Sequence, residues 1–101
     1  MNKQEIINKI KEAVQADPYY LEIQKVSLFG SQLGGNAKID SDVDVLIEFS
    51  PNAKIGFFKL ARIKRNMEAA VKKEIDLLTP EALSKFFRTE VIKEAEIIYE
   101  K

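Results

Sequence analysis

The chain contains no cysteine and no histidine among its 101 residues. Without cysteine there are no disulfides, no thiolate nucleophile and no zinc–sulfur centre. Without histidine there is no imidazole base and no nitrogen ligand for a metal. Any bound metal must therefore be held by oxygen atoms, which favours hard cations such as Mg²⁺, Mn²⁺ or Ca²⁺.

An excess of charge of one sign is also missing, because 16 Lys and Arg balance 16 Asp and Glu. Proteins that follow a nucleic-acid backbone normally carry a basic excess, so the balance argues against long DNA or RNA as a partner. The sequence has no signal-peptide pattern and no apolar run long enough to span a bilayer, so we expect a cytoplasmic protein without a membrane partner. The length predicts a single domain over residues 1–101.

Hydrophobic periodicity predicts alternating helices and strands. After Thr79-Pro80, which has the chemistry of a helix start, helical pattern continues through Phe86 and resumes from Glu90 to Tyr99. The alternation of predicted helices and strands along the chain indicates an α/β fold, in which helices pack on one face of a small mixed β-sheet. The other predicted elements are helices at 3–16 (ended by Asp17-Pro18) and 55–72, and strands at Lys25–Phe29, Asp42–Phe49 and Glu74–Leu78.

Two phenylalanine pairs, Phe57-Phe58 and Phe86-Phe87, are predicted to belong mainly to the core, although one member of each pair must point away from it. An exposed phenylalanine beside a binding surface would be a candidate for protein contact. The basic residues at positions 62, 64 and 65 are interpreted as a solvated helix face rather than an RNA-binding patch.

A glycine–serine pair, Gly30-Ser31, follows the first predicted strand. Glycine lets the backbone approach a ligand closely, and exposed amides at such a turn bind anions. The Ser31 hydroxyl adds a further donor for a phosphate oxygen. Taken alone, the pair is better explained as an ordinary turn.

Two aspartates, Asp42 and Asp44, share one face of the second predicted strand. They lie about 6.6 Å apart along the strand, and at that distance their charges repel by roughly 2 kcal/mol near a protein surface. A divalent cation between them would remove that repulsion. The alternative is a frayed strand start with both carboxylates solvated.

A third acid, Asp76, belongs to the strand Glu74–Leu78. If Ile75 and Leu77 face the core, Asp76 lies on the same side of the sheet as Asp42 and Asp44; the alternative is a routine solvated strand face. A phosphate-binding turn and three convergent acids suit phosphoryl transfer assisted by two metal ions.

Gly30-Ser31, ten intervening residues and Asp42-x-Asp44 resemble the GS-x10-D-x-D signature of the polymerase β-like nucleotidyltransferase superfamily. The short chain is most similar to the minimal nucleotidyltransferases (MNT), a prokaryotic group often paired with HEPN-domain toxins. The resemblance covers about residues 25–80. It implies a palm-like fold, transfer of AMP from ATP to a tyrosine or serine hydroxyl of a HEPN partner, and an antitoxin role.

The resemblance also implies roles for the site residues. Gly30 and Ser31 would hold the triphosphate, Asp42 and Asp44 would bind two Mg²⁺ ions, and Asp76 would ligate one metal and help to deprotonate the acceptor hydroxyl. Many minimal members carry arginines where this chain has Gln32 and Gly34. The absence of these arginines favours one alternative, a binding module that neutralises a partner by docking. A further alternative is the catalytic subunit of a small-molecule nucleotidyltransferase, which would need an additional acceptor-binding domain.

Overall fold

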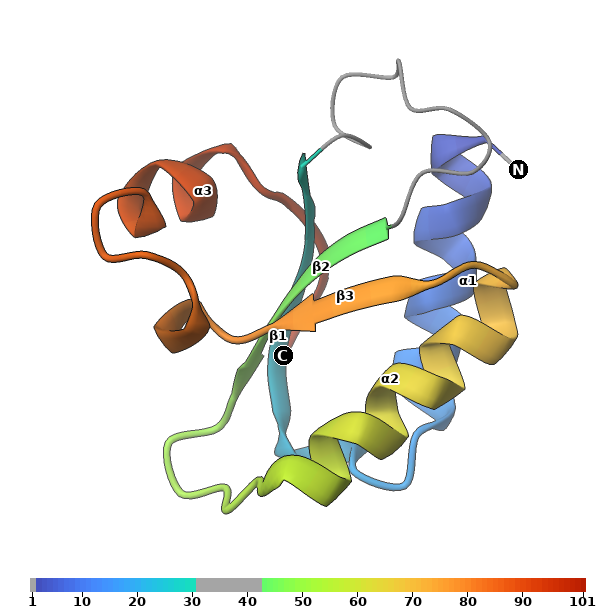
Figure 1. Cartoon of the computed structure of the whole chain (residues 1–101). Coiled ribbons are helices and arrows are strands. Elements are labelled where there is room, and N and C mark those ends of the chain that lie inside the picture. Colours follow the sequence, from blue (N-terminus) through green and yellow to red (C-terminus); the bar gives the residue numbers. More distant parts are fainter. Residues whose placement is uncertain (1, 31–42) are drawn as a thin grey trace.

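A computed structural model describes residues 2–30 and 43–101 of the chain. Within them the polypeptide forms a four-stranded sheet flanked by helices (Figure 1). The elements, in chain order, are α1 (Lys3–Ala16), η1 (Tyr20–Glu22), β1 (Ile23–Phe29), β2 (Val43–Phe49), α2 (Phe57–Val71), β3 (Ile75–Leu78), η3 (Pro80–Ala82), α3 (Arg88–Glu94) and β4 (Glu96–Glu100).

The sheet is mixed, as the sequence predicts. Its strand order is β3-β2-β1-β4. β1 runs antiparallel to β2 and to β4, whereas β2 and β3 are parallel. The parallel pair is joined through α2, which gives the β-α-β crossover that such a pair requires. The strands β3 and β4 therefore form the two edges of the described sheet.

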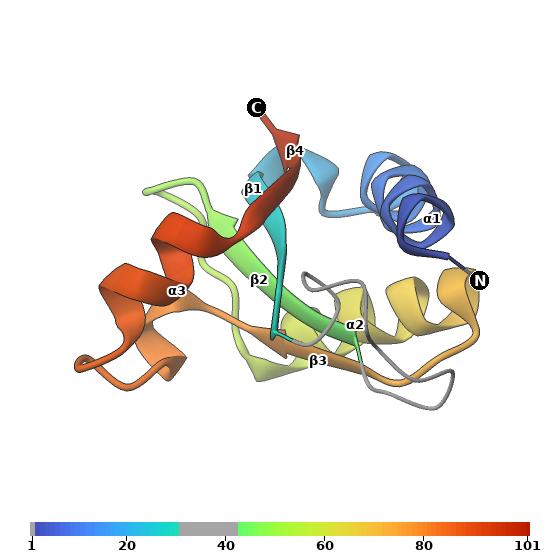
Figure 2. The same cartoon turned by 90° about the horizontal axis from the view of Figure 1, so that it is seen from above.

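Helices α1 and α2 cover one face of the sheet (Figures 1 and 2). The strands contribute their alternate residues to this face: Val43, Val45 and Ile47 of β2 are completely buried. Helical spacing supplies the opposing layer, for example Ile6 and Ile10 of α1. The buried apolar cluster consists of Ile6, Ile10, Val14, Ile23, Val26, Leu28, Val43, Val45, Ile47, Ile63, Met67, Val71, Ile75, Leu77 and Ile98.

Polar side chains fix the ends of α1. The Asn2 side chain accepts a hydrogen bond of 2.8 Å from the backbone N–H of Glu5 and caps the first turn. At the other end, the buried Asp17 accepts from the backbone N–H of Tyr19 at 2.8 Å and from the Asn66 side chain of α2 at 3.0 Å. Asp17 therefore stops the helix and ties its end to α2.

The predicted helix from Glu90 to Tyr99 is wrong in its second half. The helix α3 ends at Glu94, and Glu96–Glu100 form the edge strand β4 against β1. Val91, Ala95 and Ile98 have helical spacing, but the run around Ile98 is rich in β-branched and aromatic residues and finds backbone partners on β1. Pairing with a distant strand outweighs the local periodicity.

The segment before α3 is also less helical than predicted. Thr79 precedes a single 3-10 turn, η3, with Pro80 in its first position. Figure 2 shows α3 on the side of the sheet opposite to α1 and α2, so this last helix lies outside the main helical layer. Among the described residues, no helix is long and apolar enough to cross a membrane.

The expectation that the phenylalanine pairs lie mainly in the core is wrong. Phe57 and Phe58 are 78% and 87% exposed, and Phe86 and Phe87 are 81% and 63% exposed. The buried positions of α2 begin one turn later, at Ile63. Both pairs are therefore presented to the surroundings by the start of a helix or the loop that precedes one.

Candidate functional site

Two of the three predicted acids are neighbours on adjacent strands. Asp44 of β2 lies opposite Asp76 of β3 in the parallel pairing, which brings their Cα atoms to within about 5 Å. Residues paired in this way point to the same face of the sheet. Their neighbours Val45 and Leu77 are buried against the helices, so the two carboxylates lie on the opposite face.

Asp44 and Asp76 differ in their surroundings. The Asp44 side chain is half-buried and belongs to a central strand, whereas Asp76 is exposed on the edge strand β3. The start of β3 is held from outside by α2, because the Glu68 carboxylate accepts a hydrogen bond of 3.0 Å from the Ile75 backbone N–H. The edge strand is thereby fixed one residue before Asp76.

Gly30 brings the end of β1 against Asp44. Its neighbour Phe29 pairs with Asp44, and Gly30 itself has a φ of 77°, in the left-handed region that favours glycine. A Cβ atom at Gly30 would overlap the Oδ2 atom of Asp44. The position therefore requires glycine for two independent reasons, its backbone angle and the carboxylate beside it.

The structure describes three of the five site residues predicted from the sequence: Gly30, Asp44 and Asp76. It brings Gly30 and Asp44 into contact and places Asp76 on the next strand. Ser31 and Asp42 lie outside the described residues, so their roles stay predictions. Gln32 and Gly34, where many minimal members carry arginine, also fall in that part of the chain.

The donor set around Asp44 fits a hard cation. Two carboxylates in register on one face are oxygen ligands of the kind that Mg²⁺ prefers, and the chain has no histidine or cysteine to compete with them. Within the described residues no group of three or more potential ligands gathers. The third carboxylate of the predicted set, Asp42, belongs to the stretch before β2 that is not described.

The structure adds residues that the sequence pattern did not single out. Asp76 shares a hollow of about 550 Å³ with Lys64 and Glu68 of α2 and with Glu74 and Ile75. The sequence presented Lys64 as one of several solvated bases on a helix face. Its approach to Asp76 depends on how α2 crosses β3, for which local sequence carries no signal.

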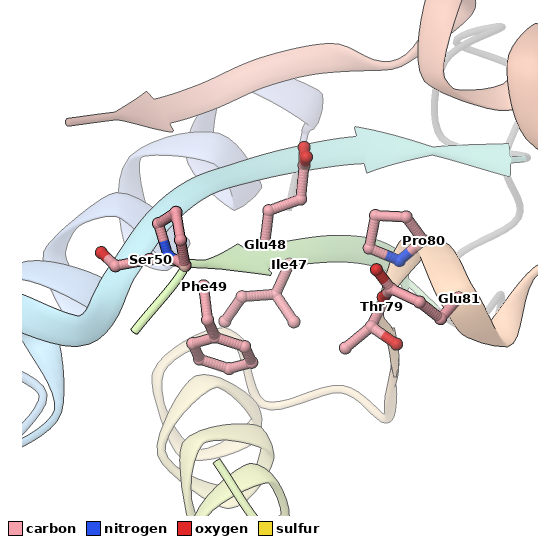
Figure 3. A pocket seen from close by; sticks show the side chains of 8 residues that line it. Ile47, Glu48, Phe49, Ser50, Thr79, Pro80 and Glu81 are labelled. Atoms are coloured by element: carbon pink, nitrogen blue, oxygen red, sulfur yellow. The ribbon is translucent and has the colours of Figure 1, made fainter. Parts of the chain in front are cut away.

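A second hollow lies at the opposite end of β2 and holds none of the predicted site residues. Figure 3 shows Thr79, Pro80 and Glu81, at the start of η3, next to Ile47 and Glu48 of β2. Its volume is about 300 Å³. Glu48 shares the face of Asp44 but lies about 13 Å further along the strand. This end of the sheet is therefore separate from the acid pair.

Comparisons with known proteins find relatives over most of the chain. Residues 8–101 match the family described as polymerase β nucleotidyltransferase. A Methanocaldococcus jannaschii chain assigned as a protein adenylyltransferase is 29% identical over 89 residues, which cover 88% of this chain and 94% of that one. A solved structure described as a minimal nucleotidyltransferase is 27% identical, with a TM-score of 0.75 and 94% of each chain covered.

A more distant solved structure shares the fold. It describes a tri-AMPylated HEPN toxin of Shewanella oneidensis in complex with an MNT antitoxin, and it matches at 17% identity with a TM-score of 0.68. The match covers 98% of this chain and 73% of that one. Because the family match spans nearly the whole sequence, this chain belongs to the polymerase β nucleotidyltransferase family.

Proposed function

We propose that this nucleotidyltransferase moves AMP from ATP to a tyrosine or serine hydroxyl of a HEPN-domain protein and thereby acts as its antitoxin. The observation that carries the proposal is the pairing of Asp44 with Asp76 beside Gly30. The assignment of the Methanocaldococcus jannaschii relative as a protein adenylyltransferase supports the reaction. The complex of an AMPylated HEPN toxin with an MNT antitoxin supports the class of acceptor.

In the proposed reaction, the acceptor hydroxyl oxygen forms a bond to the α-phosphorus of ATP. The bond from that phosphorus to the oxygen bridging to the β-phosphate breaks, and pyrophosphate leaves. Asp76, exposed on the edge strand, accepts the hydroxyl proton. Gly30 and Ser31 bind the triphosphate at the end of β1.

Asp42, Asp44 and Asp76 are the residues that would hold the divalent metal, with Mg²⁺ as the expected ion. When bound, the metal neutralises charge on the triphosphate and on the departing pyrophosphate. Asp44 on the central strand gives the site a rigid ligand, because its neighbours Val43 and Val45 are completely buried. The carboxylate beside Gly30 is therefore held in place by the core.

A protein acceptor is favoured by what surrounds the acids. Among residues 2–30 and 43–101, Asp76 lies on an edge strand, next to a broad hollow rather than in an enclosed pocket. Such a surface suits a hydroxyl that another protein delivers better than a small free acceptor, which needs a concave site that buries most of it.

The direct test is incubation of this chain with a HEPN-domain protein encoded beside it, Mg²⁺ and each NTP in turn, followed by intact-mass measurement of the acceptor. We expect a mass gain of one or more AMP units with ATP and no gain with Asp44→Asn. Constant acceptor mass with every nucleotide would refute the transfer reaction.

The second candidate is a binding module that silences its partner by docking alone. It is favoured by the absence of arginine at positions 32 and 34, where many minimal members carry it. Under this alternative the ribonuclease activity of the HEPN protein falls while its mass stays constant. The Asp44→Asn variant would then inhibit the HEPN protein to the same extent as the parent chain.

A further inference from the structure

Two neighbouring phenylalanine rings project from the first turn of α2. Phe57 and Phe58 are 78% and 87% exposed, and their rings meet edge to face with centroids 5.9 Å apart. The chain's own core takes the later residues Ile63, Met67 and Val71 instead. A paired aromatic surface of this kind is characteristic of sites that contact another molecule.

Phe57 also lines a hollow that lies between α2 and the edge strand β3. The hollow has a volume of about 210 Å³ and is lined by Phe57, Leu60, Ala61, Lys64 and Leu77. Lys64 belongs to the wall of the larger hollow around Asp76 as well. The two hollows share Lys64 as a lining residue, and we call them together the α2–β3 groove, with Phe57 at one end and Asp76 at the other.

The groove has one base, Lys64, at the junction of its two hollows, and the larger hollow also holds the acids Glu68, Glu74 and Asp76. From Phe49 to Met67 the sequence has five bases and no acid, whereas the whole chain is neutral. Lys59 is engaged within the molecule, 3.9 Å from the Glu22 carboxylate and over the Tyr19 ring. Lys64 makes no ion pair within the described residues and is partly exposed between the two hollows. In the smaller hollow Lys64 is the only charged lining residue, so a ligand there would gain from a negative charge facing Lys64.

We propose that the α2–β3 groove docks the acceptor protein, through a segment that places an apolar side chain at Phe57 and an acidic side chain at Lys64. The acceptor hydroxyl then lies at the Asp76 end of the same groove. The proposal rests on the proposed transfer to a protein hydroxyl, because continuity with Asp76 is what makes the groove a path to the reacting atoms. The second phenylalanine pair, Phe86-Phe87, precedes α3 on the other side of the sheet.

The two phenylalanine pairs allow a matched comparison. Binding of the neighbouring HEPN-domain protein is measured by calorimetry in EDTA and without nucleotide, so that docking is separated from chemistry. We expect Phe57→Ser with Phe58→Ser to weaken binding at least tenfold, and Phe86→Ser with Phe87→Ser to leave it within twofold. All four residues are exposed, so both double variants should keep the parent's melting temperature.

Lys64 is tested against its neighbour Arg65, which carries the same charge but lines neither hollow. In the same EDTA binding measurement without nucleotide, we expect Lys64→Gln to weaken binding of the HEPN-domain protein at least fivefold. Arg65→Gln should change that affinity less than twofold. A general loss of positive charge would affect both variants equally and would contradict a groove contact.

Docking and chemistry fail separately in these experiments. Unchanged binding by the Phe57 and Phe58 double variant, or a larger loss from the Phe86 and Phe87 variant, overturns the groove even if AMP is transferred. If binding is weakened by the Phe57 and Phe58 double variant but not by the Phe86 and Phe87 one, and the acceptor gains no mass, the groove is supported and the transfer reaction is overturned. If the parent chain does not bind the HEPN-domain protein at all, both proposals are overturned.

Discussion

At Gly30, a hydrogen atom in place of a side chain lets β1 end against the Asp44 carboxylate. The residue has a φ of 77°, and an added Cβ would overlap Asp44 Oδ2. The same chain offers a contrasting glycine, Gly56, whose φ is −85° and whose Cβ position has no atom within 4 Å among the described residues. The two positions separate the local requirement at the site from the general effect of adding a methyl group.

We expect Gly30→Ala to lower the free energy of unfolding by about 1–2 kcal/mol, since alanine is strained in the left-handed region. It should also reduce transfer more than the stability loss explains, because Asp44 must move. Gly56→Ala should stay within about 1 kcal/mol, because lower unfolded-state entropy offsets a weaker helix cap. Urea unfolding and the transfer rate measure both variants; equal effects would contradict a special role for Gly30.

Asp44 and Glu48 share one strand and one face, so they form a matched pair of carboxylates. We expect Asp44→Asn to lower the transfer rate at least about 100-fold, as the loss of one preorganised electrostatic group does elsewhere. Glu48→Gln removes the same charge about 13 Å away and should change the rate less than threefold. Both variants should unfold within about 1 kcal/mol of the parent, because neither side chain belongs to the apolar cluster.

Ser31 follows Gly30 in the predicted phosphate-binding turn. We expect Ser31→Ala to weaken Mg²⁺–ATP binding, with the affinity falling about fivefold or more for one lost hydrogen bond to a charged phosphate. Stability without ligand should be unchanged. Isothermal calorimetry with ATP measures the affinity directly. Equal affinity in the variant and the parent would make Gly30-Ser31 an ordinary turn.

At the scale of elements, β4 shows that pairing with a neighbouring strand can determine whether a segment forms a helix or a strand. Ile98 is 6% exposed and belongs to the core cluster, whereas the preceding Ile97 is 48% exposed. The alternation of the two isoleucines is the period-2 pattern of a strand.

Substitution distinguishes the two isoleucines. Ile98→Ala should lower the free energy of unfolding by about 2–4 kcal/mol, because it leaves a cavity in the core. Ile97→Ala should cost less than about 1 kcal/mol. Chemical denaturation of both variants, with coincident far-ultraviolet and tyrosine signals, measures the difference. Similar losses would contradict the position of β4 in the sheet.

The local sequence pattern predicts the first helix and the faces of the strands correctly, because both depend on residues close together in the sequence. The helix 3–16 is reproduced by α1 because its apolar spacing and its Asp17 stop are both encoded within the segment. The common face of Asp44 and Asp76 followed from strand alternation. Phe57 was misplaced because helical periodicity identifies a stripe without showing how far along the helix the core extends. The α2–β3 groove was not predictable, because it depends on the packing of two elements.

At the scale of the whole molecule, the net charge is zero but the charged residues are distributed unevenly along the sequence. The stretch from Phe49 to Met67 carries five bases and no acid, so the other residues together hold an excess of five acids. This stretch contains the first turns of α2 and the Lys64 wall of the groove. Charge separated in this way steers the approach of an acidic partner, even though it adds little to the stability of the fold.

The division of charge predicts how docking depends on salt. Raising NaCl from about 20 mM to about 500 mM shortens the screening length from about 20 Å to about 4 Å. We therefore expect the association rate of the HEPN-domain acceptor to fall more than about tenfold, while the dissociation rate changes less than about threefold. Stopped-flow measurement in EDTA gives both rates. Lys64→Glu should flatten the salt dependence, and Lys93→Glu on α3 should leave it unchanged. An association rate that is insensitive to salt in the parent chain would show that the basic stretch does not face the partner.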